Sequence, residues 1–89
     1  MAWKIKFSAT ARKSISKLDK PIALRITRFL SERVSPLENP RTMGQALTGA
    51  VFGSYWRYRL GDYRLICDIQ DEVLCILVID LGNRKEIYD

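Results

Sequence analysis

Alternation of apolar and polar residues predicts β-strands near the start and in the second half of the chain. In Ala2–Phe7, three bulky apolar residues alternate with lysines, as is typical of a strand with one buried face. Three further strands are predicted at Tyr55–Leu60, Tyr63–Ile69 and Val73–Leu81. The last is apolar at every position except Asp80, which indicates a central strand covered on both faces.

Helical spacing replaces alternation between the first two predicted strands. Ser8 can cap a helix, and the apolar positions that follow share one face: Ala11, Ile15 and Leu18. Asp19 and Pro21 mark a break and a new helix start, and a second apolar stripe runs from Ile22 to about Val34. The stretch Ser35–Ser54 holds two of the three prolines and three of the five glycines, so it is predicted to be a loop.

The resulting order is β-α-α-β-β-β, within one domain of 89 residues (1–89). A central strand needs a neighbour on each side, so the first strand is expected to pair with it in parallel, with the helices as the crossover. The fold class is therefore α+β, with one four-stranded, mostly antiparallel sheet. A helical hairpin covers one face of this sheet.

The stretch YWRYRLGDYRL is predicted to be a hairpin. Gly61-Asp62 suits a type II′ turn, which pairs Leu60 with Tyr63 and Arg59 with Arg64. The apolar side chains then face the helices: Trp56, Tyr58, Leu60, Tyr63, Leu65, Cys67 and Ile69. The opposite, exposed face carries Arg57, Arg59 and Arg64, although like charges opposite each other destabilise a sheet.

Charge and residue types narrow the possible chemistry. Fifteen Lys and Arg against ten Asp and Glu give a net charge of +5, which favours an anionic partner. The chain has no histidine and only two cysteines, Cys67 and Cys75, so a metal site is not expected and no cofactor is indicated. We interpret both cysteines as buried thiols in a reducing compartment. With no signal peptide or apolar run of membrane-spanning length, the expected location is cytoplasmic.

Two interpretations of the arginine face stay open. It can be a solvated surface with weak ion pairs to Asp62 and Asp68, or a site where a polyanion offsets the crowding of the guanidinium groups. The tail adds Arg84 and Lys85 directly after the central strand. Tyr88 can either stack on a base or pack back to anchor the chain end.

An RNA-cleaving site of this composition needs no metal. The 2′-OH of the substrate attacks the adjacent phosphate, and the protein aligns the reactants and stabilises the charge of the phosphorane. Arginines suit that role but are poor bases. Acid–base help would then come from Lys6, Lys85, Tyr88, a carboxylate or an outside group, which predicts a nuclease that depends on a larger assembly.

The hairpin YWRYRLGDYRL and the tail GNRKEIY resemble the RelE/ParE superfamily of bacterial toxins, and its RelE branch in particular. The resemblance covers nearly the whole chain and implies the RelE-like microbial RNase fold. It implies the toxin of a type II toxin–antitoxin system, a ribosome-dependent mRNA endonuclease that cuts in the A site and leaves a 2′,3′-cyclic phosphate. A cognate RelB-like antitoxin would neutralise it, and the complex would bind operator DNA and repress its own promoter.

Carried over by position, the resemblance implies five catalytic residues: Arg57, Arg59, Arg64, Arg84 and Tyr88. Arg57 and Arg64 would stabilise the phosphate, Arg84 the phosphorane or the leaving group, and Tyr88 would stack on a base. Relatives often have lysines at the first two positions, and many have a histidine in place of Asn83. We expect further basic residues to contact RNA: Lys6, Arg12, Lys13, Lys17, Arg25, Arg28 and Lys85.

Two other functions remain as alternatives. A ParE-like toxin would inhibit DNA gyrase without cleaving RNA, although that branch generally lacks the tail with Arg84 and Tyr88. A non-catalytic nucleic-acid-binding module would bind RNA with a steep dependence on salt and leave it intact.

Overall fold

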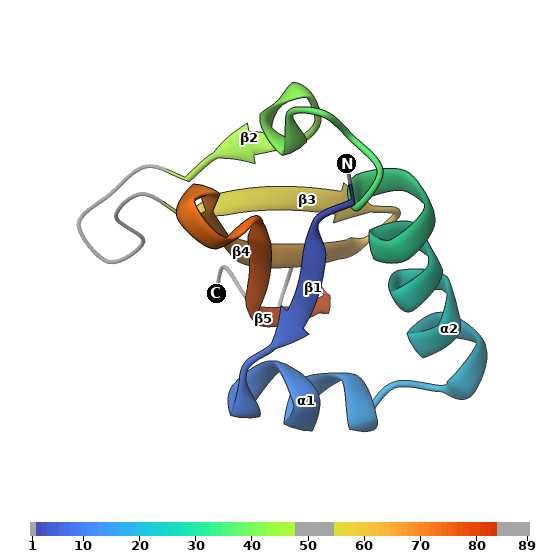
Figure 1. The fold of residues 1–89 in the computed structure, drawn as a ribbon. Helices are drawn as coiled ribbons and strands as arrows, with labels where there is room; N and C mark the ends of the chain where they lie inside the picture. Colours follow the sequence, from blue (N-terminus) through green and yellow to red (C-terminus); the bar gives the residue numbers. More distant parts are fainter. Residues whose placement is uncertain (1, 48–54, 84–89) are drawn as a thin grey trace.

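The computed structural model describes residues 2–47 and 55–83, which form an α+β fold (Figure 1). The strands are β1 (Lys4–Phe7), β2 (Gln45–Ala46), β3 (Trp56–Leu60), β4 (Tyr63–Gln70) and β5 (Cys75–Asn83), and the helices are α1 (Ala9–Ser16) and α2 (Lys20–Arg28). A π-helical segment, Phe29–Val34, continues α2, and short 3-10 turns occupy Pro40–Thr42 and Asp71–Val73. No helix in these two described ranges is long and apolar enough to cross a membrane.

The sheet has five strands in the order β1-β5-β4-β3-β2, one more than predicted. As expected, β1 runs parallel to β5, which has a neighbour on each side, with the helices as the crossover, and the other pairs are antiparallel. The additional strand, β2, lies within the predicted loop and pairs with β3 through Gln45↔Arg57 and Ala46↔Trp56. Two residues are too few to show an alternating pattern, so only the tertiary pairing reveals this strand.

Local signals place both helices. The Ser8 side chain caps α1 by accepting a hydrogen bond from the Ala11 amide at 3.0 Å, and its hydroxyl donates to the Ile79 carbonyl at 2.6 Å. Pro21 stands in the first turn of α2, where a missing N–H costs nothing. The predicted second helix is not α-helical to its end, because its last six residues adopt the wider π-helical turn.

The core lies between the helices and one face of the sheet. Figure 1 shows α1 below the sheet and α2 to its right. Buried core side chains from the helical half are Ala11, Ile26, Phe29, Leu30 and Val34, and those from the sheet include Tyr58, Leu65, Cys67, Ile76 and Val78. All seven hairpin residues predicted to face the helices belong to this core or pack against it. The face assignment of the hairpin is therefore confirmed.

The hairpin turn also has the predicted register. Leu60 pairs with Tyr63, and Arg59 pairs with Arg64. Gly61 has a φ of +60°, and Asp62 is not among the described non-glycine residues with positive φ. That combination is the one expected of a type II′ turn, which requires positive φ only at its first central position.

Three sets of side-chain hydrogen bonds hold the segment 39–47 against the sheet. The buried Tyr58 hydroxyl donates to the Pro40 carbonyl at 2.7 Å, and the indole N–H of Trp56 donates to the Met43 carbonyl at 2.7 Å. Arg41 forms two hydrogen bonds of 2.9 Å with the Asp71 carboxylate in the β4–β5 turn. These contacts hold β2 against β3.

We expect the Arg41–Asp71 pair to make stability depend on acid pH. The Arg41 guanidinium lowers the pKa of the Asp71 carboxyl through its hydrogen bonds. A carboxyl whose pKa is lower in the folded state stabilises the fold above its unfolded pKa, and this contribution is lost as pH falls through the folded pKa. The effect is small because both side chains are exposed to solvent.

Chemical unfolding of wild type and Asp71→Asn across pH measures this contribution. The variant should unfold more easily at neutral pH, and the difference should diminish as pH falls through the lowered pKa of the Asp71 carboxyl. Asp62→Asn, at the exposed hairpin turn, serves as the control. A difference between wild type and Asp71→Asn that stays constant down to low pH would contradict the assignment.

Candidate nucleic-acid interface

Two arginines face each other across β3 and β4 on the sheet face away from the helices. In the register, Arg59 pairs with Arg64, and Arg64 in turn pairs with Gly82 of β5. Arg57 lies two residues before Arg59 on the same face and pairs with Ile66. The structure thus brings together the three hairpin arginines predicted from the sequence.

Arg64 is buried and Arg57 is half-buried, which corrects the prediction that all three arginines are exposed. Arg64 is 4% exposed, and the adjacent Ile66 is also buried at 4%. The register partner of Arg64 on β5 is Gly82, which has no side chain. Strand alternation shows which face a residue occupies, but it does not show how much of that face is covered.

The three guanidinium groups have different surroundings, which reduces their mutual repulsion. Arg57 donates a hydrogen bond from Nη2 to the Oε1 atom of Gln45 on β2. Arg64 turns toward the hairpin end, where its Nη1 makes long contacts of 3.3 Å with the Gly61 carbonyl and 3.5 Å with the Tyr63 carbonyl. Arg59 is exposed to solvent. The crowding that the sequence predicts is thus partly relieved by divergence of the side chains.

A bulge in the central strand lies next to this arginine face. The pairing of β4 with β5 shifts between Ile66 and Cys67, whose partners are Asp80 and Val78. The Asp80 carboxylate accepts a hydrogen bond from Ser14 of α1 at 2.9 Å, so it is held at the helical side of the strand. Bulges bend a strand and occur often beside functional sites. Here the bend precedes the strand end at Gly82 and Asn83.

The predicted tail residues Arg84, Lys85 and Tyr88 lie outside the described residues. Asn83, the last residue of β5, pairs with Tyr63, one position from the pair formed by Arg64 and Gly82. The described strand therefore ends beside the arginine face. The roles expected for the three tail residues stay predictions.

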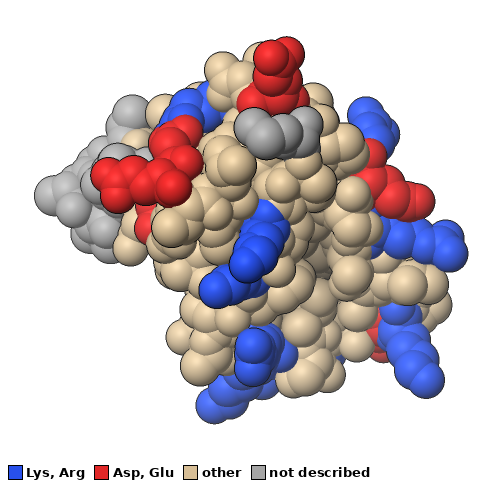
Figure 2. All heavy atoms as spheres, viewed as in Figure 1, with Lys and Arg blue, Asp and Glu red and all other residues tan. Residues whose placement is uncertain are grey.

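Most of the other predicted RNA contacts are not near the arginine face. Lys6 shares this sheet face but stands on the edge strand β1, opposite Leu77. The others are exposed on the two helices, which cover the opposite face, or directly after α1 in the case of Lys17: Arg12, Lys13, Lys17, Arg25 and Arg28. In Figure 2, basic side chains stand over β1 and over the helices at the right and bottom. The predicted RNA-binding residues therefore lie on both sides of the sheet, and their contacts with RNA stay predictions.

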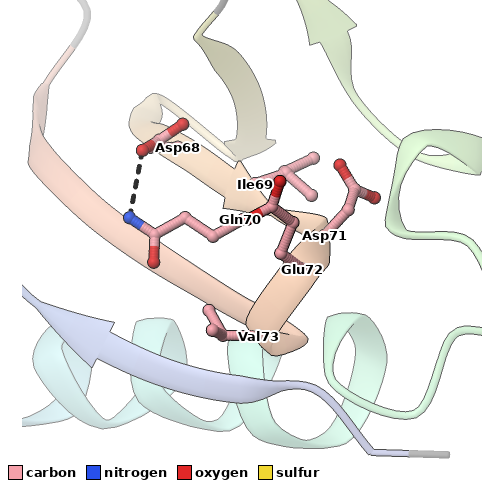
Figure 3. Close-up of a pocket in the computed structure, with 6 residues that line it drawn as sticks. All are labelled: Asp68, Ile69, Gln70, Asp71, Glu72 and Val73. Carbon is pink, nitrogen blue, oxygen red and sulfur yellow. Dashed lines mark hydrogen bonds between the residues drawn. The ribbon is translucent and has the colours of Figure 1, made fainter.

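An acidic hollow marks the other end of the β4–β5 hairpin (Figure 3). It has a volume of about 490 Å³ and is lined by consecutive residues from Asp68 to Val73. Asp68 accepts a hydrogen bond from Gln70 at 3.1 Å, so that carboxylate has a partner on its own strand. Three carboxylates around this hollow would repel phosphate, so it is not a candidate RNA site. Among the residues described, no group of three His, Cys, Asp or Glu side chains could hold a metal ion.

Two buried groups with shifted pKa values belong to the core rather than to a reactive site. Burial raises the pKa of the Tyr58 hydroxyl and that of the Cys67 thiol, so both stay protonated at neutral pH. Both cysteines are buried and free, which confirms the interpretation as buried thiols. Neither group contributes to the arginine face. The described part of that face offers positive charge and hydrogen-bond donors, which suit a phosphate group.

Gln45 is the residue of this face that the sequence interpretation missed. It lies in the two-residue strand within a stretch rich in proline and glycine. No periodicity distinguishes it there from other loop residues. Only the pairing of β2 with β3 brings it next to Arg57.

Comparisons with known proteins agree with this architecture. The sequence profile of a family described as "ParE toxin of type II toxin-antitoxin system, parDE" matches residues 5–88. Toxin RelG of Mycobacterium tuberculosis is 28% identical over 88 residues, which cover 99% of this chain and 98% of that protein.

Solved structures show the same fold. The toxin–antitoxin complex RelBE2 from M. tuberculosis contains a chain with a TM-score of 0.84 and 25% identity, covering 94% of this chain and 93% of that one. A mutant of E. coli toxin RelE in the free state gives a TM-score of 0.76 at 27% identity, covering 99% and 90%. The chain therefore belongs to the ParE toxin family of type II toxin–antitoxin systems, within the RelE/ParE superfamily.

Proposed function

We propose that the protein is a ribosome-dependent mRNA endonuclease of the RelE type that inhibits translation by cutting mRNA in the A site. The observation that carries this proposal is the pair Arg59–Arg64 with Arg57 beside it, on a sheet face that the helices leave uncovered. Three guanidinium groups on adjacent strands provide fixed donors for a phosphate. The similarity to RelG and to E. coli RelE supports the same activity.

The proposed reaction is attack of a ribose 2′-OH on the adjacent phosphate, which yields a 2′,3′-cyclic phosphate and a free 5′-OH. Arg57 and Arg64 stabilise the negative charge of the phosphorane, and a buried guanidinium such as Arg64 is more effective there because water screens it less. Arg84 stabilises the phosphorane or the departing 5′-oxygen, and Tyr88 stacks on a substrate base. Arg59 interacts with the RNA backbone from the exposed side of the pair.

The proposed partners follow from the same family. RelE chains have been solved with RelB antitoxins in complexes such as that from Pyrococcus horikoshii OT3. By this analogy a RelB-like antitoxin neutralises the protein, and the complex binds operator DNA mainly through the antitoxin.

The ribosome is a proposed partner for a chemical reason. Arginine side chains are poor proton acceptors, so the ribosome supplies or orients the acid–base groups that the arginines do not provide.

Primer extension on a defined mRNA held in purified ribosomes tests the proposal. Cuts within the A-site codon should appear only when both ribosomes and the protein are present. They should disappear in Arg84→Ala, whereas Arg33→Ala, an exposed arginine of the helical half, should cut like wild type. Absence of cuts at protein levels that stop cell growth would refute the nuclease proposal.

Inhibition of DNA gyrase is the second candidate, and the description of the matching family favours it. It predicts that the purified protein inhibits supercoiling of plasmid DNA by gyrase and leaves ribosome-bound mRNA intact. The two assays therefore separate the two functions. A protein that binds RNA but is inactive in both assays would be a non-catalytic binding module.

A further inference from the structure

The contact of Gln45 with Arg57 differs in kind from the contact of Asp71 with Arg41. The Arg57 Nη2 donates to the neutral amide oxygen of Gln45. Arg41, by contrast, donates one hydrogen bond from each of its two terminal nitrogens to the carboxylate of Asp71, both at 2.9 Å. A carboxylate neutralises the guanidinium, whereas an amide oxygen orients it and leaves its positive charge available.

The backbone around Gln45 is held closely against β3. Gln45 pairs with Arg57 in the sheet, and the Leu47 amide donates to the Tyr55 carbonyl at 3.0 Å. On the other side, Gly44 passes so close to β3 that an added Cβ would lie 2.3 Å from the Arg57 carbonyl oxygen. The backbone of Gln45 is therefore held in place by its pairing with β3, and Gln45 is not part of a free loop.

A fixed acceptor reduces the cost of ordering a long side chain when a ligand binds. Arginine has many rotamers, and holding it before binding removes part of that entropy loss. Only one of the five guanidinium N–H groups is used by Gln45. The remaining N–H groups can donate to a ligand.

We propose that Gln45 is a positioning residue that orients the Arg57 guanidinium toward a phosphate of RNA without neutralising it. The phosphate part of this statement rests on the proposed function. The orientation of Arg57 by Gln45 does not. The tests below therefore measure the two parts separately and do not depend on cleavage.

The first measurement is NMR of the Arg57 guanidinium in the full-length protein with ¹⁵N-labelled arginine. A held guanidinium rotates slowly about its Nε–Cζ bond, so its Nη signals should be separate in wild type and in Gln45→Glu. They should merge in Gln45→Met, which has similar bulk but no amide oxygen. The matched control is Gln70→Met, whose native partner is Asp68 at the other end of β4. Merged signals in wild type, or separate ones in Gln45→Met, would overturn the orientation.

The second measurement is the affinity for a short, fluorescently labelled single-stranded RNA at fixed salt. We expect Gln45→Met to weaken binding about five- to tenfold, the scale of one hydrogen bond to a charged group. Gln45→Glu should weaken it at least as much, because its carboxylate holds Arg57 but competes with phosphate. In an Arg57→Ala background the Gln45→Met change should have no further effect, which a purely structural role would not produce.

The outcomes are distinct. Equal losses from Gln45→Met with and without Arg57, or equal losses in Gln45→Met and Gln70→Met, would overturn the positioning role. Gln45→Glu binding RNA as tightly as wild type would overturn the role of the neutral acceptor. Intact RNA affinity without cleavage on ribosomes would refute the proposed function alone.

Discussion

Replacing Arg64 should abolish mRNA cleavage, with a loss of about 100-fold or more. Removing one preorganised donor from a charge-stabilising site costs rates of this order, and Arg64 is the most buried of the three hairpin arginines. Arg59, its partner across the strands, is exposed, and solvent weakens its interaction with a phosphate. Arg59→Ala should therefore lose only about tenfold. Single-turnover cleavage on programmed ribosomes measures both variants.

The burial of Arg64 requires a control for folding. Arg64→Ala removes the packing of the aliphatic stem as well as the charge, so its melting temperature should fall. Arg64→Met keeps a similar stem and removes the guanidinium together with its contacts to the Gly61 and Tyr63 carbonyls. It should melt at a higher temperature than Arg64→Ala and still lose the activity. Cleavage by Arg64→Met within a few-fold of wild type would contradict a direct role of the guanidinium.

Gly44→Ala, which adds one methyl group, should strongly destabilise the protein. We expect the free energy of unfolding to fall by about 2–4 kcal/mol. Gly44 has a φ of +81°, and an added Cβ would lie 2.3 Å from the Arg57 carbonyl and 2.7 Å from the Trp56 Nε1. Backbone strain and a steric clash therefore act together. Since the clash involves β3, relief requires movement of β2 and of Gln45 with it.

Gly61→Ala is the matched control, because Gly61 also has a positive φ but no atom lies within 4 Å of an added Cβ. It should cost only the backbone strain, about 1–2 kcal/mol. Urea unfolding monitored by tryptophan fluorescence compares the two variants. Equal destabilisation would show that the close approach at Gly44 does not restrict the segment, and it would weaken the inference about Gln45.

Hydrophobic patterns that extend over several residues were sufficient to predict most of the fold. Alternation over the YWRYRLGDYRL hairpin predicted its register and its buried face, and both are observed. The run Val73–Leu81, apolar except at Asp80, predicted the central strand, which is observed as Cys75–Asn83 because a 3-10 turn takes up the first residues. Ser8 and Pro21 predicted the helix starts for local reasons of hydrogen bonding.

The candidate site was predicted less completely. The sequence identified the hairpin arginines because a short turn fixes which residues face each other across two strands. It also proposed RNA contacts for helical cations such as Arg12 and Arg28, whose helices cover the opposite face, and these contacts stay predictions. Net charge carries no directional information, so it does not show which of the two basic surfaces contacts RNA.

By itself the sequence determined the order of the elements, the hairpin register and the face on which Arg57, Arg59 and Arg64 lie. These features depend on side-chain periodicity and on turn geometry between residues close in the chain. Only the tertiary structure decided that Arg64 is buried opposite Gly82 and that Gln45 reaches Arg57. Both depend on how closely segments distant in sequence approach each other, and that is set by packing.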